Sequence, residues 1–198
     1  VVDKEIYEYP YLERIHTLAT SRPLDVIFIS NGEHRAAINY SHLLETVGSR
    51  ANVKHVDGVD GRLNSYQEAA RRSRTDWFIA VFAKCQVTNE FKMMLDEWAP
   101  DYWQEPKHYI FHAKNPVNGL EYGHQAMIAY NKSLTLANTG TGLDFTLDSE
   151  HEVVPVLSGT ANYANDPWMC WRTAFREALK LRAATDVESE YRLKQWLK

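Results

Sequence analysis

The sequence predicts one α/β domain with a mostly parallel central sheet, helices on its faces and a helical segment at the C-terminal end. Three observations predict this class. Apolar runs of strand length alternate with helical patterns, and the runs are almost continuously apolar, as in strands covered on both faces. The chain of 198 residues, 44% hydrophobic, is also long enough to bury one substantial core. We expect a single domain over 1–198, with an N-terminal helix in 1–24, an α/β core in 25–165 and C-terminal helices in 166–198.

The spacing of apolar residues and the positions of proline and glycine predict the first elements. Apolar residues at helical spacing in Tyr7–Ala19 predict a short packing helix that ends before Pro23. Asp25–Ser30 is an apolar run of strand length. Ala36–Val47 then has helical spacing, and Gly48 is a suitable C-terminal stop.

The same unit repeats once more along the chain. Val53–Val56 is a short strand candidate, and the glycine-punctuated loop 57–61 follows it. Ser65, with Glu68 three residues later, predicts a capping box that opens a helix running to about Ser73. Trp77–Val81 supplies a third buried strand. The resulting βαβαβ order favours parallel strands with right-handed crossovers.

The second half contains further strand and helix candidates. Phe91–Trp98 is a short amphipathic helix, and strands are expected at 108–113, 125–130 and 153–157. The strongest helix has Asp166 as N-cap and Pro167 at its first position, followed by an apolar face of Trp168, Trp171, Phe175, Ala178 and Leu179. A last helix is expected over Asp186–Leu197.

Composition restricts the classes of function. The net charge of −4 disfavours a broad nucleic-acid-binding face, although it leaves room for a local basic patch. No run of about 18 apolar residues occurs, and no signal peptide is evident, so we expect a cytoplasmic protein with no membrane partner. Cys85 and Cys170 belong to no metal or redox motif. Because the chain begins at Val1, we expect it to be part of a longer polypeptide with a neighbouring domain.

The carboxyl ends of the first three strands are the expected ligand mouth, because parallel α/β sheets bind ligands there. Asn31 and Glu33 follow the first strand and Asp57 follows the second, where they can hydrogen-bond a base or ribose or simply form turns. Phe82-Ala83-Lys84 follows the third. It offers no acid for a metal, but Lys84 can neutralise a phosphate, or project into solvent.

A second candidate site is the polar segment Asn115–His124. Glu121 is a candidate general base or sugar ligand, and His124 can titrate near neutrality. A loop stabilised by hydrogen bonds of its own Asn and Tyr residues explains the segment equally well.

Three other patterns have ordinary explanations. His108 and His112 share a strand face, which a strand surface explains better than a metal site lacking a third ligand. A solvated face explains the regular spacing of Arg172, Arg176 and Lys180, with phosphate or nucleic-acid contact as the less favoured alternative. The same alternative applies more weakly to Arg71, Arg72 and Arg74.

Several segments together resemble a known group of proteins. They are Lys114–Gly123, Leu157–Asn162, Asp166–Trp168 and Trp171–Leu181, with further likeness over 26–30 and 56–70. In these segments the chain resembles tailed-phage proteins described as glycosyltransferase-like, with a GT-A type (Rossmann-like) fold. The resemblance implies a nucleotide sugar as donor substrate, transfer to a modified phage DNA base or another acceptor, and a location in the cytoplasm of the infected host cell.

One departure from that family bears on activity. Its members usually have an Asp-rich segment after the third strand, where such acids place a divalent metal on the diphosphate. Phe82-Ala83-Lys84 stands there in this chain, so we expect no metal bound through an Asp-x-Asp motif. Two hypotheses follow: a transferase that works without this metal, or a non-catalytic binding or structural module, such as a virion or scaffold component, that retains the fold. A third is an accessory domain that contacts DNA.

For the first hypothesis the residue roles can be stated. Asn31, Glu33 and Asp57 would hold the nucleotide and Lys84 the diphosphate, with Glu121 and His124 near the transferred sugar or acceptor.

Overall fold

The computed structural model describes residues 24–93, 105–140, 145–162, 167–183, 185 and 187–197. The strands are β1 (Asp25–Ser30), β2 (Val53–Asp57), β3 (Trp77–Phe82), β4 (Cys85–Val87), β5 (His108–Lys114), β6 (Glu121–Asn131) and β7 (His151–Ala161). The helices are α2 (Ala36–Val47), α3 (Arg62–Arg72), α4 (Lys132–Ala137), α5 (Pro167–Ala183) and α6 (Val187–Trp196), with a 3₁₀ turn at Gly48–Arg50. The predicted helix Tyr7–Ala19 lies outside the described residues. So do residues 94–98 of the predicted helix Phe91–Trp98, and residues 91–93 are not helical.

The sheet is mixed, so the prediction of a mostly parallel sheet was wrong. Its seven strands have the order β2-β1-β3-β6-β5-β7-β4. The first three strands of the chain are parallel, as expected, but β6 is antiparallel to both β3 and β5. The reason lies in the connection 115–120, which is too short for the crossover of a dozen or more residues that a parallel pair requires. The β5–β6 pair is therefore a hairpin.

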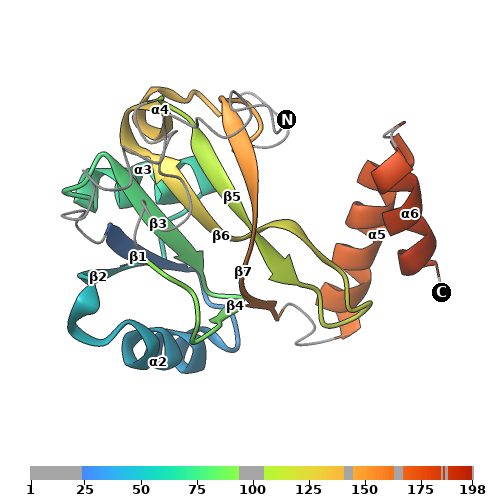
Figure 1. Ribbon diagram of the computed structural model, residues 1–198, viewed down its shortest axis with the longest axis horizontal. Helices are drawn as coiled ribbons and strands as arrows, with labels where there is room; N and C mark the ends of the chain where they lie inside the picture. Colours follow the sequence, from blue (N-terminus) through green and yellow to red (C-terminus); the bar gives the residue numbers. More distant parts are fainter. Residues whose placement is uncertain are drawn as a thin grey trace, which may run out of the picture.

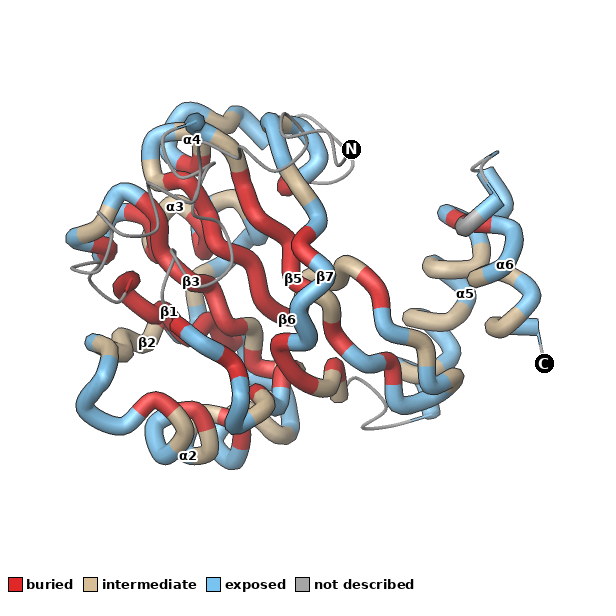
Figure 2. The backbone as a smooth tube through the Cα atoms, viewed as in Figure 1, coloured by how far each residue is buried: buried red, intermediate tan, exposed pale blue. Residues whose placement is uncertain are grey.

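The core lies on both faces of the sheet, which Figure 2 shows as buried strands at the centre of the molecule. On one face Val26, Phe28 and Ile79 pack with Leu43 of α2. On the other face Ile27, Ile29 and Phe78, which alternate with these along the strands, pack with Tyr66 of α3 and with Phe145. The continuous apolar runs in the sequence are thus explained by helices on both sides.

Several predicted elements are confirmed. Asp25–Ser30 and Ala36–Val47 form at the predicted residues, and Gly48 ends α2 with φ +56°, a conformation that favours glycine. Pro167 is the first residue of α5 in the described chain.

Other predicted element boundaries differ from those in the structure. The capping box at Ser65 is wrong, because α3 begins at Arg62 and the Ser65 hydroxyl donates to Gly61 O at 3.0 Å from inside the helix. Strand β6 begins at Glu121, so the last four residues of the predicted polar segment Asn115–His124 are strand.

The two C-terminal helices lie side by side at one end of the molecule, beyond the β5–β6 hairpin (Figure 1). The apolar face predicted for α5 does not pack into the core: Trp168, Trp171, Phe175 and Leu179 are exposed. None of the described helices is long and apolar enough to span a bilayer.

Candidate functional site

A cavity of about 460 Å³ lies between the sheet and the two C-terminal helices. Its volume is within the range usual for small-molecule sites. Strand β6, the turn after β3 and α5 supply most of the polar lining, with Arg192 coming from α6. We call it the basic pocket, because the charged side chains among its described lining residues are five cations and one carboxylate: Lys84, Arg172, Arg176, Lys180, Arg192 and Glu177.

The backbone around Lys84 is fixed on three sides. Ala83 N–H donates to Ile29 O of β1 at 2.9 Å, and the buried Asn39 side chain of α2 donates to Ala83 O at 2.7 Å. Asn162 N–H, just after β7, donates to Lys84 O at 2.6 Å. The lysine therefore sits in a rigid turn between β3 and β4, at the carboxyl end of β3, where a ligand was expected.

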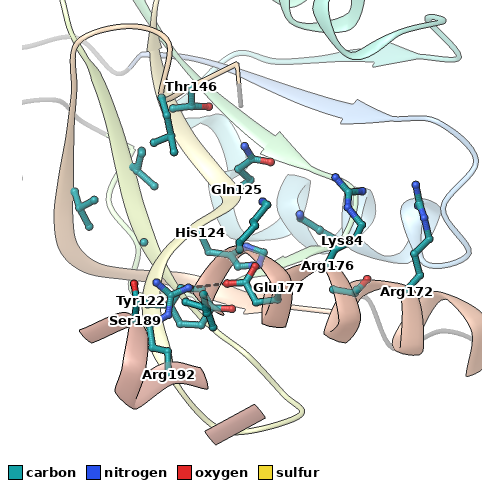
Figure 3. A pocket seen from close by; sticks show the side chains of 17 residues that line it. Lys84, Tyr122, His124, Gln125, Thr146, Arg172, Arg176, Glu177, Ser189 and Arg192 are labelled. Atoms are coloured by element: carbon teal, nitrogen blue, oxygen red, sulfur yellow. Dashed lines mark hydrogen bonds and ion pairs between the residues drawn. The ribbon is translucent and has the colours of Figure 1, made fainter. Parts of the chain in front are cut away.

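Helix α5 provides the cations of the opposite wall. Arg172, Arg176 and Lys180 recur every four residues and so lie along one side of the helix. Arg172 and Arg176 extend from α5 toward the side on which Lys84 lies (Figure 3). These side chains are exposed to solvent, and they also line the pocket.

Arg192 connects α6 to both neighbouring elements. Its guanidinium donates to Glu177 Oε1 of α5 at 2.7 Å, the pair marked in Figure 3. The same guanidinium carbon lies 3.9 Å from the centroid of the Tyr122 ring on β6, a cation–π contact. Glu177, the one carboxylate among the described residues that line the pocket, is therefore already paired.

Electrostatics in the pocket reflect burial and mutual repulsion of cations. Burial lowers the pKa of Lys84 to about 8, with Lys180 adding to the decrease and Cys85, Glu177 and Glu33 opposing it.

His124 is affected by burial and by the same pocket cations. Burial, then the charges of Lys84, Arg192 and Lys180, hold its pKa well below 6.5. The imidazole is thus neutral at pH 7. Of the predicted site residues, the structure brings Lys84 and His124 together in the pocket.

The residues predicted after β1 and β2 lie apart from this lining. Glu33 Oε2 accepts the Asn31 N–H at 2.6 Å, and both residues are exposed in the loop before α2. Asp57 accepts the Ser30 hydroxyl, which also bonds His55 Nε2 at 2.7 Å. Glu33 is nevertheless near enough to raise the pKa of Lys84.

The polar segment before β6 has most of its hydrogen bonds within itself. Asn115 N–H donates to Leu120 O, and the Asn115 side chain accepts from Val117 N–H and donates to the Tyr122 hydroxyl. Glu121 opens β6 opposite Lys114, is exposed and does not line the pocket.

The described residues contain no group of three or more His, Cys, Asp or Glu side chains placed to hold a metal ion. His108 is buried in the core rather than on a strand surface, and its Nδ1 accepts Asn131 N–H at 3.1 Å. Burial lowers its pKa to about 4. The arginines of α3 are partly accounted for by a local pair, since Arg72 contacts Glu68 at 2.8 Å.

Sequence reasoning missed that Arg172, Arg176 and Lys180 line a pocket together with Lys84. Their four-residue spacing was visible, but the face of α5 that turns toward the sheet depends on how α6 packs. The ion pair between Arg192 and Glu177 could not be predicted, because two residues fifteen positions apart on separate helices form no local sequence pattern.

No protein-family model matches the sequence, and no curated protein sequence matches it either. The solved structures that match the chain include two at low sequence identity. One is 4-diphosphocytidyl-2C-methyl-D-erythritol synthase from Anaerococcus prevotii, with TM-score 0.45, 12% identity, and coverage of 77% of this chain and 98% of that one. The other is HddC from Yersinia pseudotuberculosis, with TM-score 0.36, 12% identity, and coverage of 83% and 82%. Likeness this distant transfers no activity to this chain.

Proposed function

We propose that this chain is a glycosyltransferase-like domain that binds a nucleotide sugar, with the diphosphate held in the basic pocket by side-chain cations instead of a bridging metal. The observation that carries the proposal is the convergence of Lys84 with Arg172, Arg176 and Lys180 around one cavity. Burial is the main cause of the lowered pKa of Lys84, and repulsion by Lys180, from a separate part of the chain, adds to the decrease. An anionic ligand relieves that repulsion.

The charge of the pocket fits a diphosphate. Arg192 is neutralised by Glu177, which leaves four cations whose charge no described carboxylate in the lining balances. Arginine forks suit phosphate oxygens, while a lysine acts as a point charge. Asn31, Glu33 and Asp57, at the neighbouring strand ends, are the proposed contacts of the nucleoside.

For transfer, the pocket offers one basic group. A neutral His124 can accept the proton of an acceptor hydroxyl as its oxygen bonds to the anomeric carbon of the sugar. The bond from that carbon to the diphosphate breaks at the same time, and Lys84 with the arginines of α5 stabilises the charge left on the phosphate. We assign no step to the exposed Glu121. The acceptor proposed from the resemblance is a phage DNA base.

A non-catalytic binding module is the second candidate, and one observation favours it. The carboxylate in the pocket, Glu177, is ion-paired with Arg192, and the low pKa of His124 makes it a weak base. A chain of this kind would bind the same phosphorylated ligand without turning it over.

Calorimetry with uridine and guanosine diphospho-sugars, with and without manganese, tests the binding. We expect binding that is independent of the metal and weaker by about 10- to 100-fold in Lys84→Ala and Arg176→Ala, the cost of losing a charge-assisted contact. Lys114→Ala is the matched control, because Lys114 is an exposed cation outside the pocket. Absence of binding for every nucleotide sugar would remove both candidates. Binding that requires manganese would contradict the metal-free mode.

Turnover separates the two candidates. NMR of the bound donor over time would show loss of the sugar–phosphate bond for a transferase, in the presence of an oligonucleotide or water as acceptor. An intact donor in every case would favour the binding module.

A further inference from the structure

Helix α5 carries an exposed apolar stripe, which consists of Trp168, Trp171, Phe175 and Leu179. Their exposed fractions are 63%, 55%, 49% and 55%. The three rings lie along the helix, with successive centroids 5.2 Å apart and interplanar angles of 24° and 9°. The aromatic groups thus form one continuous apolar ridge rather than isolated exposed side chains.

The stripe is a different face from those already described. Leu181 is buried, and Glu177 is bonded to α6 through Arg192, so the side of α5 around them faces inward. Lys180 lies on the side that lines the basic pocket. No described residue buries the stripe, and contiguous exposed apolar surface of this kind usually marks an interaction site.

Charges around the stripe identify the partner's chemistry. Helix α5 contains four cations and one acid, and that acid, Glu177, is withdrawn into the ion pair with Arg192. Arg172 follows Trp168 by four residues, and Arg182 follows Leu179 by three, so a cation borders the stripe near each end. The outer surface of α5 is therefore apolar and basic, with no unpaired acid among its described side chains.

We propose that this stripe docks α5 on an anionic lipid surface, with the helix lying in the plane of the interface. Helices that bind this way combine Trp, Phe and Leu on one face with Lys and Arg beside it. The rings enter the headgroup boundary, and the arginine stems reach back to lipid phosphates. A second copy of the chain is a poorer occupant, because pairing two stripes would place the bordering arginines together without an acid to neutralise them.

This mode of binding needs no membrane-spanning segment. The expectation of no membrane partner rested on the lack of a long apolar run, and that lack has no bearing on a helix that lies on a surface. The inference does not rest on the proposed function, since Trp168, Trp171, Phe175 and Leu179 do not line the basic pocket, and Arg172 is the one residue that both use.

Vesicle flotation tests the proposal. The purified chain is mixed at low salt with vesicles of phosphatidylcholine, or of phosphatidylcholine containing phosphatidylglycerol at about one third. We expect binding to the anionic vesicles that decreases as salt is raised, with a blue shift of tryptophan emission. Trp171→Glu should weaken binding by at least about tenfold, since it places a charge in the apolar contact. Arg182→Gln should weaken it by about fivefold, the effect of one cation at an anionic surface.

Ile38→Glu is the matched control, because Ile38 is an equally exposed apolar residue, at 58%, on the separate helix α2. It should bind vesicles as the unmodified chain does. Failure of the unmodified chain to bind anionic vesicles at low salt would overturn the proposal, as would binding that Trp171→Glu leaves intact. Sedimentation that reveals dimers lost in Trp171→Glu, without vesicle binding, would overturn it too and assign the stripe to self-association.

Discussion

Replacing Lys84 by methionine should make the protein more stable while weakening its affinity for a phosphorylated ligand. Burial lowers the pKa of this lysine from its ordinary 10.5 to about 8, which means that the folded state is destabilised by keeping the ammonium charged. Each pH unit of such a decrease corresponds to about 1.4 kcal/mol. At pH 7 the penalty is therefore at most about 3 kcal/mol, and partial exposure of the side chain reduces it to about 1–2 kcal/mol. Methionine retains the apolar stem without the charge.

The sign of the pH dependence gives a second check. Between pH 8 and 10.5 the unfolded chain keeps the Lys84 proton and the folded chain has lost it, so the unmodified protein gains stability as pH rises through this window. The advantage of Lys84→Met should therefore be largest at pH 7 and fall by more than half by about pH 9.5. Urea unfolding of both proteins at the two pH values measures it. A variant no more stable than the unmodified protein at pH 7, or a difference that does not shrink at high pH, would refute the reasoning.

Three further predictions concern the pocket and the framework. Affinity for a diphospho-sugar should fall on the order of tenfold from pH 7 to 9, because Lys84 loses its proton while the charge of the ligand stays constant. Calorimetry of Lys84→Ala should show no such fall. Gly159→Ala should destabilise the fold by at least about 2 kcal/mol in thermal unfolding, because a Cβ there would lie 2.2 Å from Gln86 O of β4; an unchanged Tm would show that the β4–β7 pair yields easily. Asp25→Asn should cost about 1–3 kcal/mol at neutral pH, because Asp25 Oδ2 accepts from Lys54 at 2.7 Å. Although burial opposes it, hydrogen bonding lowers the pKa of Asp25 below 3.8, so unfolding curves of the two proteins should converge as pH falls through that lowered value and differ above it.

The parts of the fold that local pattern determines could be predicted. Asp25–Ser30, Ala36–Val47 and Trp77–Phe82 have the apolar runs and glycine punctuation that identify elements within a few residues. Strand direction in the second half could not, because an apolar run has the same appearance in a parallel and an antiparallel strand. The short connection 115–120 is the available clue, but the polar residues Glu121–His124 give no sign in the sequence that they belong to strand β6.

Only one wall of the candidate site could be predicted from the sequence. Lys84 was visible because it ends a recognisable buried strand, and ligands bind at such ends. The opposite wall depends on which face of α5 turns toward the sheet. For a helix with large aromatic residues, the pattern predicts an apolar face in the core, whereas here Trp168 and Trp171 are exposed and the cations line the cavity. Packing against α6 through Arg192 decides this, and it is a tertiary contact.

Helix α5 has an inward side, a pocket side and an apolar side. The rotation of the helix about its own axis therefore fixes the position of all three sides at once. Each residue advances the helix by about 100°, so one residue inserted between Trp168 and Arg172 would rotate all later side chains by that angle. Arg172, Arg176 and Lys180 would then leave the cavity together, and Glu177 would no longer point at Arg192. Substitutions can alter one face at a time, but a change in length alters all three, so natural variation in this helix should preserve spacing more strictly than residue identity.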